Sequence, residues 1–300
     1  MQTAYLDDTK LTARTRARLE KRTQPLQDDL LTLHETPDPS RPEYALTHGV
    51  SDSVASVLTA VSQRIGKVRQ VVLIGTGGSS LGVEAVHAAL GGARGNATEL
   101  LTLDVLTPSA LAETIERLRR LRSCHSLAIC VISKSGTTAE TVVNAAVLLD
   151  ALEDHFGMEI YERVVAISDP GSPLLRYTKR QGGLALTMPD SVGGRYSVGT
   201  EVGLVPLQLL GHDATAFAQG LQLASSAEQL PQSAAAAARL AWYITIGYRH
   251  YNIFAFHPDL FTLGAWYRQL QAESLGKAVT RSGKAFRKGL VPTISTPTEL

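Results

Sequence analysis

Two loops in the sequence contain the residue types that bind an anion. Residues 75–82 read GTGGSSLG and residues 133–141 read SKSGTTAET, and each loop lies between an apolar run and a helical pattern. Backbone N–H groups at the start of a helix, together with hydroxyl and ammonium donors, stabilise a negative charge. The two loops therefore predict a site for a small phosphorylated molecule.

Each loop also has an interpretation that involves no ligand. The glycine spacing of the first loop differs from a dinucleotide fingerprint, and Asp104 is only a weak partner for a ribose. The alternative for this loop is a tight turn between a strand and a helix. The second loop lacks the Gly-x-x-x-x-Gly-Lys pattern of a nucleotide-binding loop, and its alternative is an ordinary Ser/Thr helix cap.

Two further segments contain charged residues with suitable neighbours. Arg195 follows two glycines in residues 192–198, VGGRYSV, and offers an anion a permanent planar charge. Its alternative is a surface turn with a salt bridge. Glu273 lies near the end of an apolar helix, where burial would make it a stronger base, and Gln269 lies one turn earlier. The alternative is an exposed glutamate at a helix terminus.

The composition limits the class of protein that holds these segments. The 300 residues are 44% hydrophobic and 19% charged, which is typical of a soluble globular protein. The formal net charge of +1 disfavours partners such as nucleic acid or a membrane surface. Residues 1–10 have no apolar run, and no stretch has the length of a transmembrane helix. We therefore expect a cytoplasmic protein whose anion site depends on local geometry.

The two cysteines, Cys124 and Cys130, have no second pair with which to complete a four-ligand metal site. We expect both to be buried thiols in a reducing compartment.

Five apolar runs that alternate with helical patterns must position the loops. The expected strands are Gln70–Gly75, Leu100–Val105, Leu127–Ser133, Arg163–Ser168 and Leu184–Thr187. The expected helices between them cover about 81–90, 110–121, 138–156 and 173–181. This alternation predicts the α/β class, with a flavodoxin-like doubly wound parallel sheet. The two anion loops then flank one crevice at the carboxyl ends of parallel strands.

The remaining elements are mostly helical. Helices are expected at 11–33, with a possible interruption at Pro25, and at 50–65, 202–210, 214–227 and 233–248. A strand at 252–256 and a helix at 258–272, capped by Gly276, indicate the start of a second α/β unit. Residues 289–300 show no strand or helix that would close a sheet, so we expect a C-terminally truncated chain.

These elements predict three parts. Residues 1–66 form a helical segment that packs on the second domain, and residues 67–195 form the phosphate-binding domain. Residues 196–300 form a helical connection and an incomplete second domain.

The four polar segments, in this order and at these separations, resemble the glucose-6-phosphate isomerase family. The resemblance runs from about residue 71 to residue 277, and Gly-Gly-Arg-Tyr-Ser at 193–197 is its most specific stretch. It implies two sugar-isomerase (SIS) domains in a protein that works as a homodimer. It also implies interconversion of glucose 6-phosphate and fructose 6-phosphate through an enediolate, without a metal or an organic cofactor.

The resemblance also implies a role for each matching residue. Glu273 is the base that moves a proton between C2 and C1, and Arg195 is the cation that stabilises the enediolate. The residues implied to contact the substrate are Gly78, Ser79, Ser133, Lys134, Ser135, Thr138, Gly194 and Gln269.

The sequence departs from the family at its end. The family's ring-opening histidine and a later lysine lie beyond the base, and this sequence stops at Leu300 before either motif, while His257 precedes Glu273. Two alternatives stay open: a non-catalytic regulator that binds sugar phosphates, and an isomerase that also accepts mannose 6-phosphate. A regulator needs the phosphate loop but no base, so the presence of both Arg195 and Glu273 argues against it.

Overall fold

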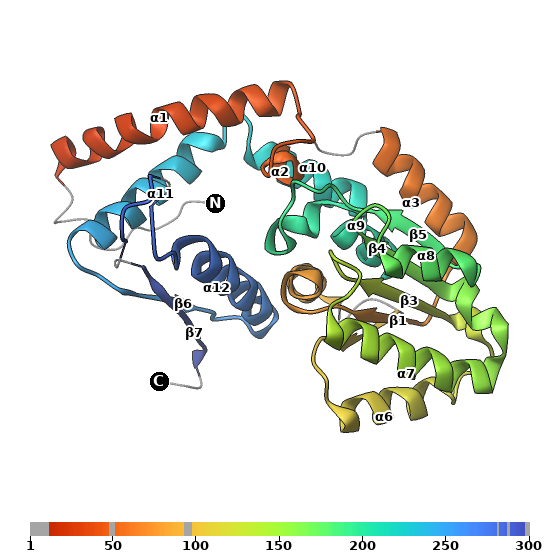
Figure 1. The fold of residues 1–300 in the computed structure, drawn as a ribbon. Helices are drawn as coiled ribbons and strands as arrows, with labels where there is room; N and C mark the ends of the chain where they lie inside the picture. Colours follow the sequence, from red (N-terminus) through yellow and green to blue (C-terminus); the bar gives the residue numbers. More distant parts are fainter. Residues whose placement is uncertain (1–11, 48–51, 93–97, 281, 287–288, 298–300) are drawn as a thin grey trace.

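The computed structural model describes residues 12–47, 52–92, 98–280, 282–286 and 289–297. Its largest feature is a five-stranded, all-parallel sheet with the order β2-β1-β3-β4-β5 (Figure 1). The strands are β1 (Gln70–Ile74), β2 (Glu99–Leu103), β3 (Leu127–Ile132), β4 (Val164–Ser168) and β5 (Leu184–Thr187). The predicted doubly wound fold class is confirmed, and each strand end lies within two residues of its predicted position.

The central strands are buried on both faces, which is why they appear as uninterrupted apolar runs in the sequence. Successive side chains of a strand point to opposite faces, so Val71 and Leu73 enter one core while Val72 and Ile74 enter the other. Cys130, in β3, and Cys124, just before it, are buried free thiols, as predicted. Because β1 lies between β2 and β3, the ligand crevice of such a sheet is expected where β1 and β3 end.

Helices cover both faces of this sheet. Apolar residues of α6 (Pro108–Leu118) and α7 (Ala139–Phe156) pack on the face that contains Ile74. The opposite core contains residues of α3 (Asp52–Ile65), α4 (Leu81–Ala89), α9 (Glu201–Leu209) and α10 (Ala214–Ala224). Helix α8 (Pro173–Arg180) contacts β4 and β5. Two short 3-10 helices, η1 (Gly77–Ser79) and η4 (Gly194–Gly199), contact each other beyond the carboxyl end of β1.

The C-terminal part contains a second, two-stranded parallel sheet. This part contains α11 (Leu230–Thr245), β6 (His250–Phe254), α12 (Phe261–Leu275) and β7 (Val291–Ser295), and the sheet pairs β6 with β7. Gly276 follows α12 as its C-cap, as predicted. The expectation that residues 289–300 contain no strand is wrong, because His250 pairs with Val291 and Phe254 with Ser295. The residues that pair with this short segment lie far away in the sequence, so its own pattern showed little sign of a strand.

The N-terminal helices divide between the two parts of the molecule. Helix α1 (Ala13–Glu35) continues through Pro25, contrary to the expected interruption, and Leu19 packs with Trp242 of α11. Along the predicted apolar face, Leu26 is 56% exposed, so only part of that face is buried. Helix α3 instead packs on the five-stranded sheet, and α2 (Tyr44–Thr47) contacts α1, α10 and η4.

Helix α12 joins the two parts because it packs along α4. Gly82 of α4 makes this approach close: a β-carbon there would lie 3.0 Å from Val198 and 3.6 Å from the indole nitrogen of Trp266. No helix among the described residues is both long enough and apolar enough to cross a membrane.

Candidate functional site

The loop after β1 lies directly against the Gly-Gly-Arg turn. Gly77 adopts a φ of +57°, a conformation that favours glycine. A β-carbon on Gly78 would lie 2.3 Å from the carbonyl carbon of Gly194 and 2.4 Å from the backbone nitrogen of Arg195. Because no side chain fits at position 78, only the backbone of Gly78 is available to a ligand. Ser79, also predicted here, is half-buried in η1.

The loop after β3 is organised by its own hydroxyl groups. The Ser133 hydroxyl accepts a hydrogen bond from the Gly136 backbone N–H at 3.1 Å and lies 2.9 Å from the Thr138 hydroxyl. The Ser135 hydroxyl accepts from both the N–H and the hydroxyl of Thr137, at 3.2 and 2.9 Å. Thr138 is the N-cap of α7, yet its side chain accepts no capping bond. The simple helix-cap alternative is therefore wrong, and the exposed hydroxyls and the helix start favour an anion.

Lys134 links this loop to the chain that leads into the Gly-Gly-Arg turn. Its ammonium group donates to the carbonyl oxygens of Asp190 and Val192, at 2.7 and 3.1 Å. The backbone carbonyl of Lys134 accepts from the Ser168 hydroxyl at the end of β4, at 3.0 Å. Lys134 therefore holds the predicted phosphate loop and the turn at a fixed spacing.

The Arg195 side chain is fixed on three sides. Its Nε donates to the Ser274 hydroxyl at 3.1 Å, and its Nη1 donates to Oε2 of Glu273 at 3.2 Å. The guanidinium lies 4.8 Å from the centre of the Tyr196 ring, within the range of a cation–π contact. The Trp266 indole donates to the Arg195 carbonyl oxygen at 3.1 Å. The arginine is thus an oriented charge that faces α12.

The Glu273 carboxylate is held through both oxygens. Arg195 binds Oε2, and the Gln269 side-chain amide donates to Oε1 at 2.9 Å. The Glu273 side chain is 46% exposed, so the burial that would strengthen it as a base is not provided by the described residues. Gln269 also approaches the first loop, because a β-carbon on Gly77 would lie 3.0 Å from its amide nitrogen.

The structure thus brings most of the predicted site residues to one edge of the sheet. The first loop contacts the Gly-Gly-Arg turn and Gln269, and the turn contacts both Glu273 and the Lys134 ammonium. Asp104, the weak ribose candidate, is exposed after β2.

Three residues that contact Arg195 had no predicted role: Tyr196, Trp266 and Ser274. A signal for two of them exists in the sequence. One face of the helix, at the spacing of three and four residues, contains Trp266, Gln269, Glu273 and Ser274. Polar residues on this face replace the apolar ones expected of a packed face.

A comparison with protein families identifies the group to which these motifs belong. A family model described as phosphoglucose isomerase matches residues 51–293, which is most of the chain. The chain belongs to the phosphoglucose isomerase family. The resemblance inferred from the four segments is therefore confirmed, and the matched range contains every predicted site residue of this family member.

Curated relatives agree with this assignment. The glucose-6-phosphate isomerase of Thermus thermophilus is 34% identical over 231 residues, which cover 76% of this chain and 54% of that protein. The glucose-6-phosphate isomerase of Leptospira interrogans is 33% identical over 264 residues, covering 82% and 58%. The chain thus spans somewhat more than half the length of these curated relatives.

Solved structures of phosphoglucose isomerases and similar proteins share the fold. A hypothetical protein from Thermus thermophilus has a TM-score of 0.74 and 28% identity, and the match covers 96% of this chain and 68% of that one. A glucose-6-phosphate isomerase from Chlamydia trachomatis also has a TM-score of 0.74, at 22% identity, with 99% and 63% covered. The agreement supports the doubly wound architecture.

Proposed function

We propose that this chain carries the phosphate-binding loop and the proton-transfer pair of an aldose–ketose isomerase that interconverts glucose 6-phosphate and fructose 6-phosphate. The observation that carries the proposal is the contact between Arg195 and Glu273 beside two anion-type loops. Family membership supports the reaction class. No metal or organic cofactor is part of this proposal.

The chemistry requires a base next to a fixed positive charge. Glu273 removes the proton at C2 of the open-chain aldose, the C–H electron pair forms the C1–C2 double bond, and the carbonyl electrons move to O1. Returning the proton to C1, while the O2 hydroxyl proton passes to O1, gives the ketose. Arg195 stabilises the negative oxygen of the intermediate, because an oriented charge acts without reorganisation at the moment of reaction.

The phosphate anchors the substrate away from the reacting carbons. We assign it to Ser133, Ser135 and Thr138, with Lys134 close by, because these residues bring hydroxyl groups to the start of α7. Binding at this remote group supplies positioning energy for proton transfer. Gly78, Ser79, Gly194 and Gln269 are assigned to the sugar side, and we propose a homodimer for the assembly.

The test measures turnover and binding separately. Fructose 6-phosphate formation is followed for the chain and for Glu273→Gln, while calorimetry measures binding of glucose 6-phosphate. Turnover by the chain, its loss in Glu273→Gln and retained binding in both support the proposal. Glu20→Gln on the exposed face of α1 is the matched control and is expected to turn over normally.

Two other outcomes contradict the proposal. Binding without turnover in either protein, even with the open-chain sugar supplied, favours a sugar-phosphate-binding regulator. Equal turnover by Glu273→Gln removes the assigned base. Running the same assay with mannose 6-phosphate tests the broader substrate range.

A further inference from the structure

A cluster of three metal-ligand residues lies at the edge of the sheet opposite the anion loops. Cys124 and His125 belong to the 3-10 helix η2 (Cys124–Ser126), directly before β3. Glu159 belongs to η3 (Met158–Arg163), directly before β4. Because these strands are parallel, η2 and η3 meet at the amino edge, whereas the anion loops follow the carboxyl ends.

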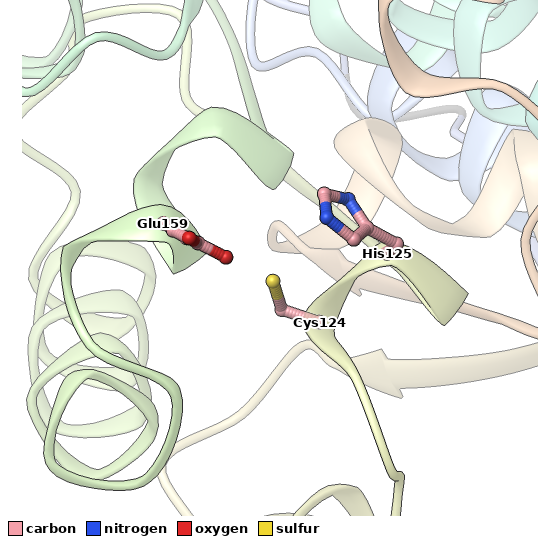
Figure 2. Close-up of side chains that lie close together, drawn as sticks. All are labelled: Cys124, His125 and Glu159. Carbon is pink, nitrogen blue, oxygen red and sulfur yellow. The ribbon is translucent and has the colours of Figure 1, made fainter.

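The three side chains point toward one another. Figure 2 shows the Cys124 thiol directed into the space between the Glu159 carboxylate and the His125 ring. One ligand atom from each residue lies within 4.8 Å of the other two. Ligand atoms of a tetrahedral zinc site lie about 3.5 Å apart, given metal–ligand distances of about 2.0 to 2.3 Å. Metal binding therefore requires the ligand atoms to move closer than the 4.8 Å limit within which they lie.

The backbone beneath the cluster is held by one buried arginine. The Arg163 side chain donates to the carbonyl oxygens of His125, Leu127 and Ile65, at 3.2, 2.9 and 2.7 Å. The Ser123 hydroxyl also accepts from the His125 backbone N–H at 3.2 Å. These bonds fix the start of β3 against η3, so the ligand residues are carried by a rigid frame.

The Cys124 side chain belongs to the hydrophobic core on one face of the sheet, whereas the other two side chains of the cluster are open to solvent. Among the residues that the structure describes, no hydrogen bond or ion pair holds the His125 ring or the Glu159 carboxylate. Both side chains are exposed, whereas the thiol of Cys124 is buried. A cation from solvent can therefore reach the His125 ring and the Glu159 carboxylate directly, whereas the Cys124 sulfur lies behind them in the protein interior.

The charge around the cluster suits a divalent cation. Two carboxylates, Glu159 and Glu162, act on the Cys124 thiol against one cation, Arg163, so negative charge outweighs positive charge around the sulfur. Burial, and then these carboxylates, raise the pKa of the thiol, so its proton has to leave as the metal binds. Thiolate, imidazole and carboxylate together favour zinc over magnesium or calcium, which prefer oxygen ligands alone. Three protein ligands leave a fourth position for water.

We propose that Cys124, His125 and Glu159 form a zinc site that joins the starts of β3 and β4, separate from the anion loops. Binding replaces the thiol proton, which passes to solvent, and forms the Zn–S bond. The sequence alone gives no sign of such a site, because Cys124 and His125 are adjacent, whereas Glu159 comes from the next helix–strand connection.

The test uses the whole chain after treatment with a chelator. Zn²⁺ is titrated against a chromophoric chelator, and Co²⁺ is added separately to detect a thiolate-to-cobalt charge-transfer band. We expect one equivalent to bind, the band to appear, and the thermal unfolding midpoint to rise with the Zn²⁺ concentration. Loss of a residue that only hydrogen-bonds to a metal ligand lowers the metal affinity about 10- to 100-fold. His125→Gln and Glu159→Gln remove proposed ligands, so each should lower the Zn²⁺ affinity at least that much.

Matched controls separate this site from general metal binding. His155→Gln and Glu113→Gln change the same residue types at exposed positions outside the cluster and should keep the affinity. Cys124→Ser should abolish the cobalt band, and the two exposed variants keep the test valid if that variant folds poorly. Absence of binding by the chain, or equal affinity in His125→Gln, Glu159→Gln and the controls, would overturn the proposal.

Discussion

The guanidinium of Arg195 meets the carboxylate of Glu273 at 3.2 Å, although the two residues are 78 positions apart in the sequence. The last turn of a helix is the negative end of its dipole, so a carboxylate at that position is otherwise unfavourable. Arg195 offsets this cost, and Gln269 holds the second oxygen. The pair thus joins the Gly-Gly-Arg turn to α12 and aligns the carboxylate proposed as the base with a cation.

The first prediction concerns the geometry of this arginine. Arg195→Lys keeps the charge but cannot bind Ser274 and Glu273 at the same time through a rigid planar group. We expect proton transfer to slow by about 10²- to 10³-fold, the usual cost of losing an oriented donor to a developing oxyanion. The measurement is exchange of the C1 hydrogen of fructose 6-phosphate with solvent deuterium.

Arg268→Lys on α12, the helix that carries Glu273, is the control for this prediction, because Arg268 is exposed. Phosphosugar affinity should change little in either variant, since the phosphate loop is untouched. An Arg195→Lys protein that exchanges at the normal rate would show that the cation needs no fixed orientation.

The second prediction concerns the contact between the first loop and the turn. In Gly78→Ala the new methyl group meets the Gly194 backbone, which cannot move aside as a flexible side chain can. We expect a loss of about 1–3 kcal/mol in the free energy of unfolding, as is usual for overpacking. Urea denaturation measures this change.

Gly220→Ala is the opposite case, because no atom lies within 4 Å of the β-carbon position on α10. Replacing a helical glycine by alanine there should stabilise the chain by up to about 1 kcal/mol. If both glycine variants had the same stability, the close approach of Gly78 to Gly194 would lose its support.

The third prediction is a dependence of stability on pH. Nδ1 of His87 lies 2.8 Å from Nε2 of His212, and burial lowers the pKa of both, with His212 lowering that of His87 further. The unfolded chain therefore binds protons more readily near pH 6.5, the ordinary pKa of histidine. The stabilising contribution is present above that pH and is lost as the pH falls through the lowered pKa of each histidine.

Unfolding midpoints measured from pH 7.5 to pH 5 test this relationship. The midpoint of the natural chain should fall across the range, and His87→Gln should reduce the fall. His250→Gln, at an exposed position on β6, should leave the profile unchanged. A profile that His87→Gln does not alter would mean that other groups cause the pH dependence.

Much of the fold followed from local patterns, because β1 and β3 are buried on both faces and the loops after them contain recognisable residue types. The partnership of Arg195 with Glu273 was implied by the resemblance of the combined motifs to the isomerase family. The exposure of Glu273 was one of two alternatives that the sequence left open, since burial depends on what surrounds a helix end. Strand β7 and the approach of Glu159 to Cys124 were missed for a related reason: both depend on pairing or packing between distant segments.

The pairing of β6 with β7 affects the position of Glu273. Helix α12 is the crossover between these two strands, and Gly264 lets it lie so close to β7 that a β-carbon there would be 2.3 Å from Ile294. Glu273 is carried at the far end of that same crossover. The small sheet thus sets the position of the helix that carries Glu273, so a substitution at Ile294 is expected to displace a carboxylate at the other end of that helix.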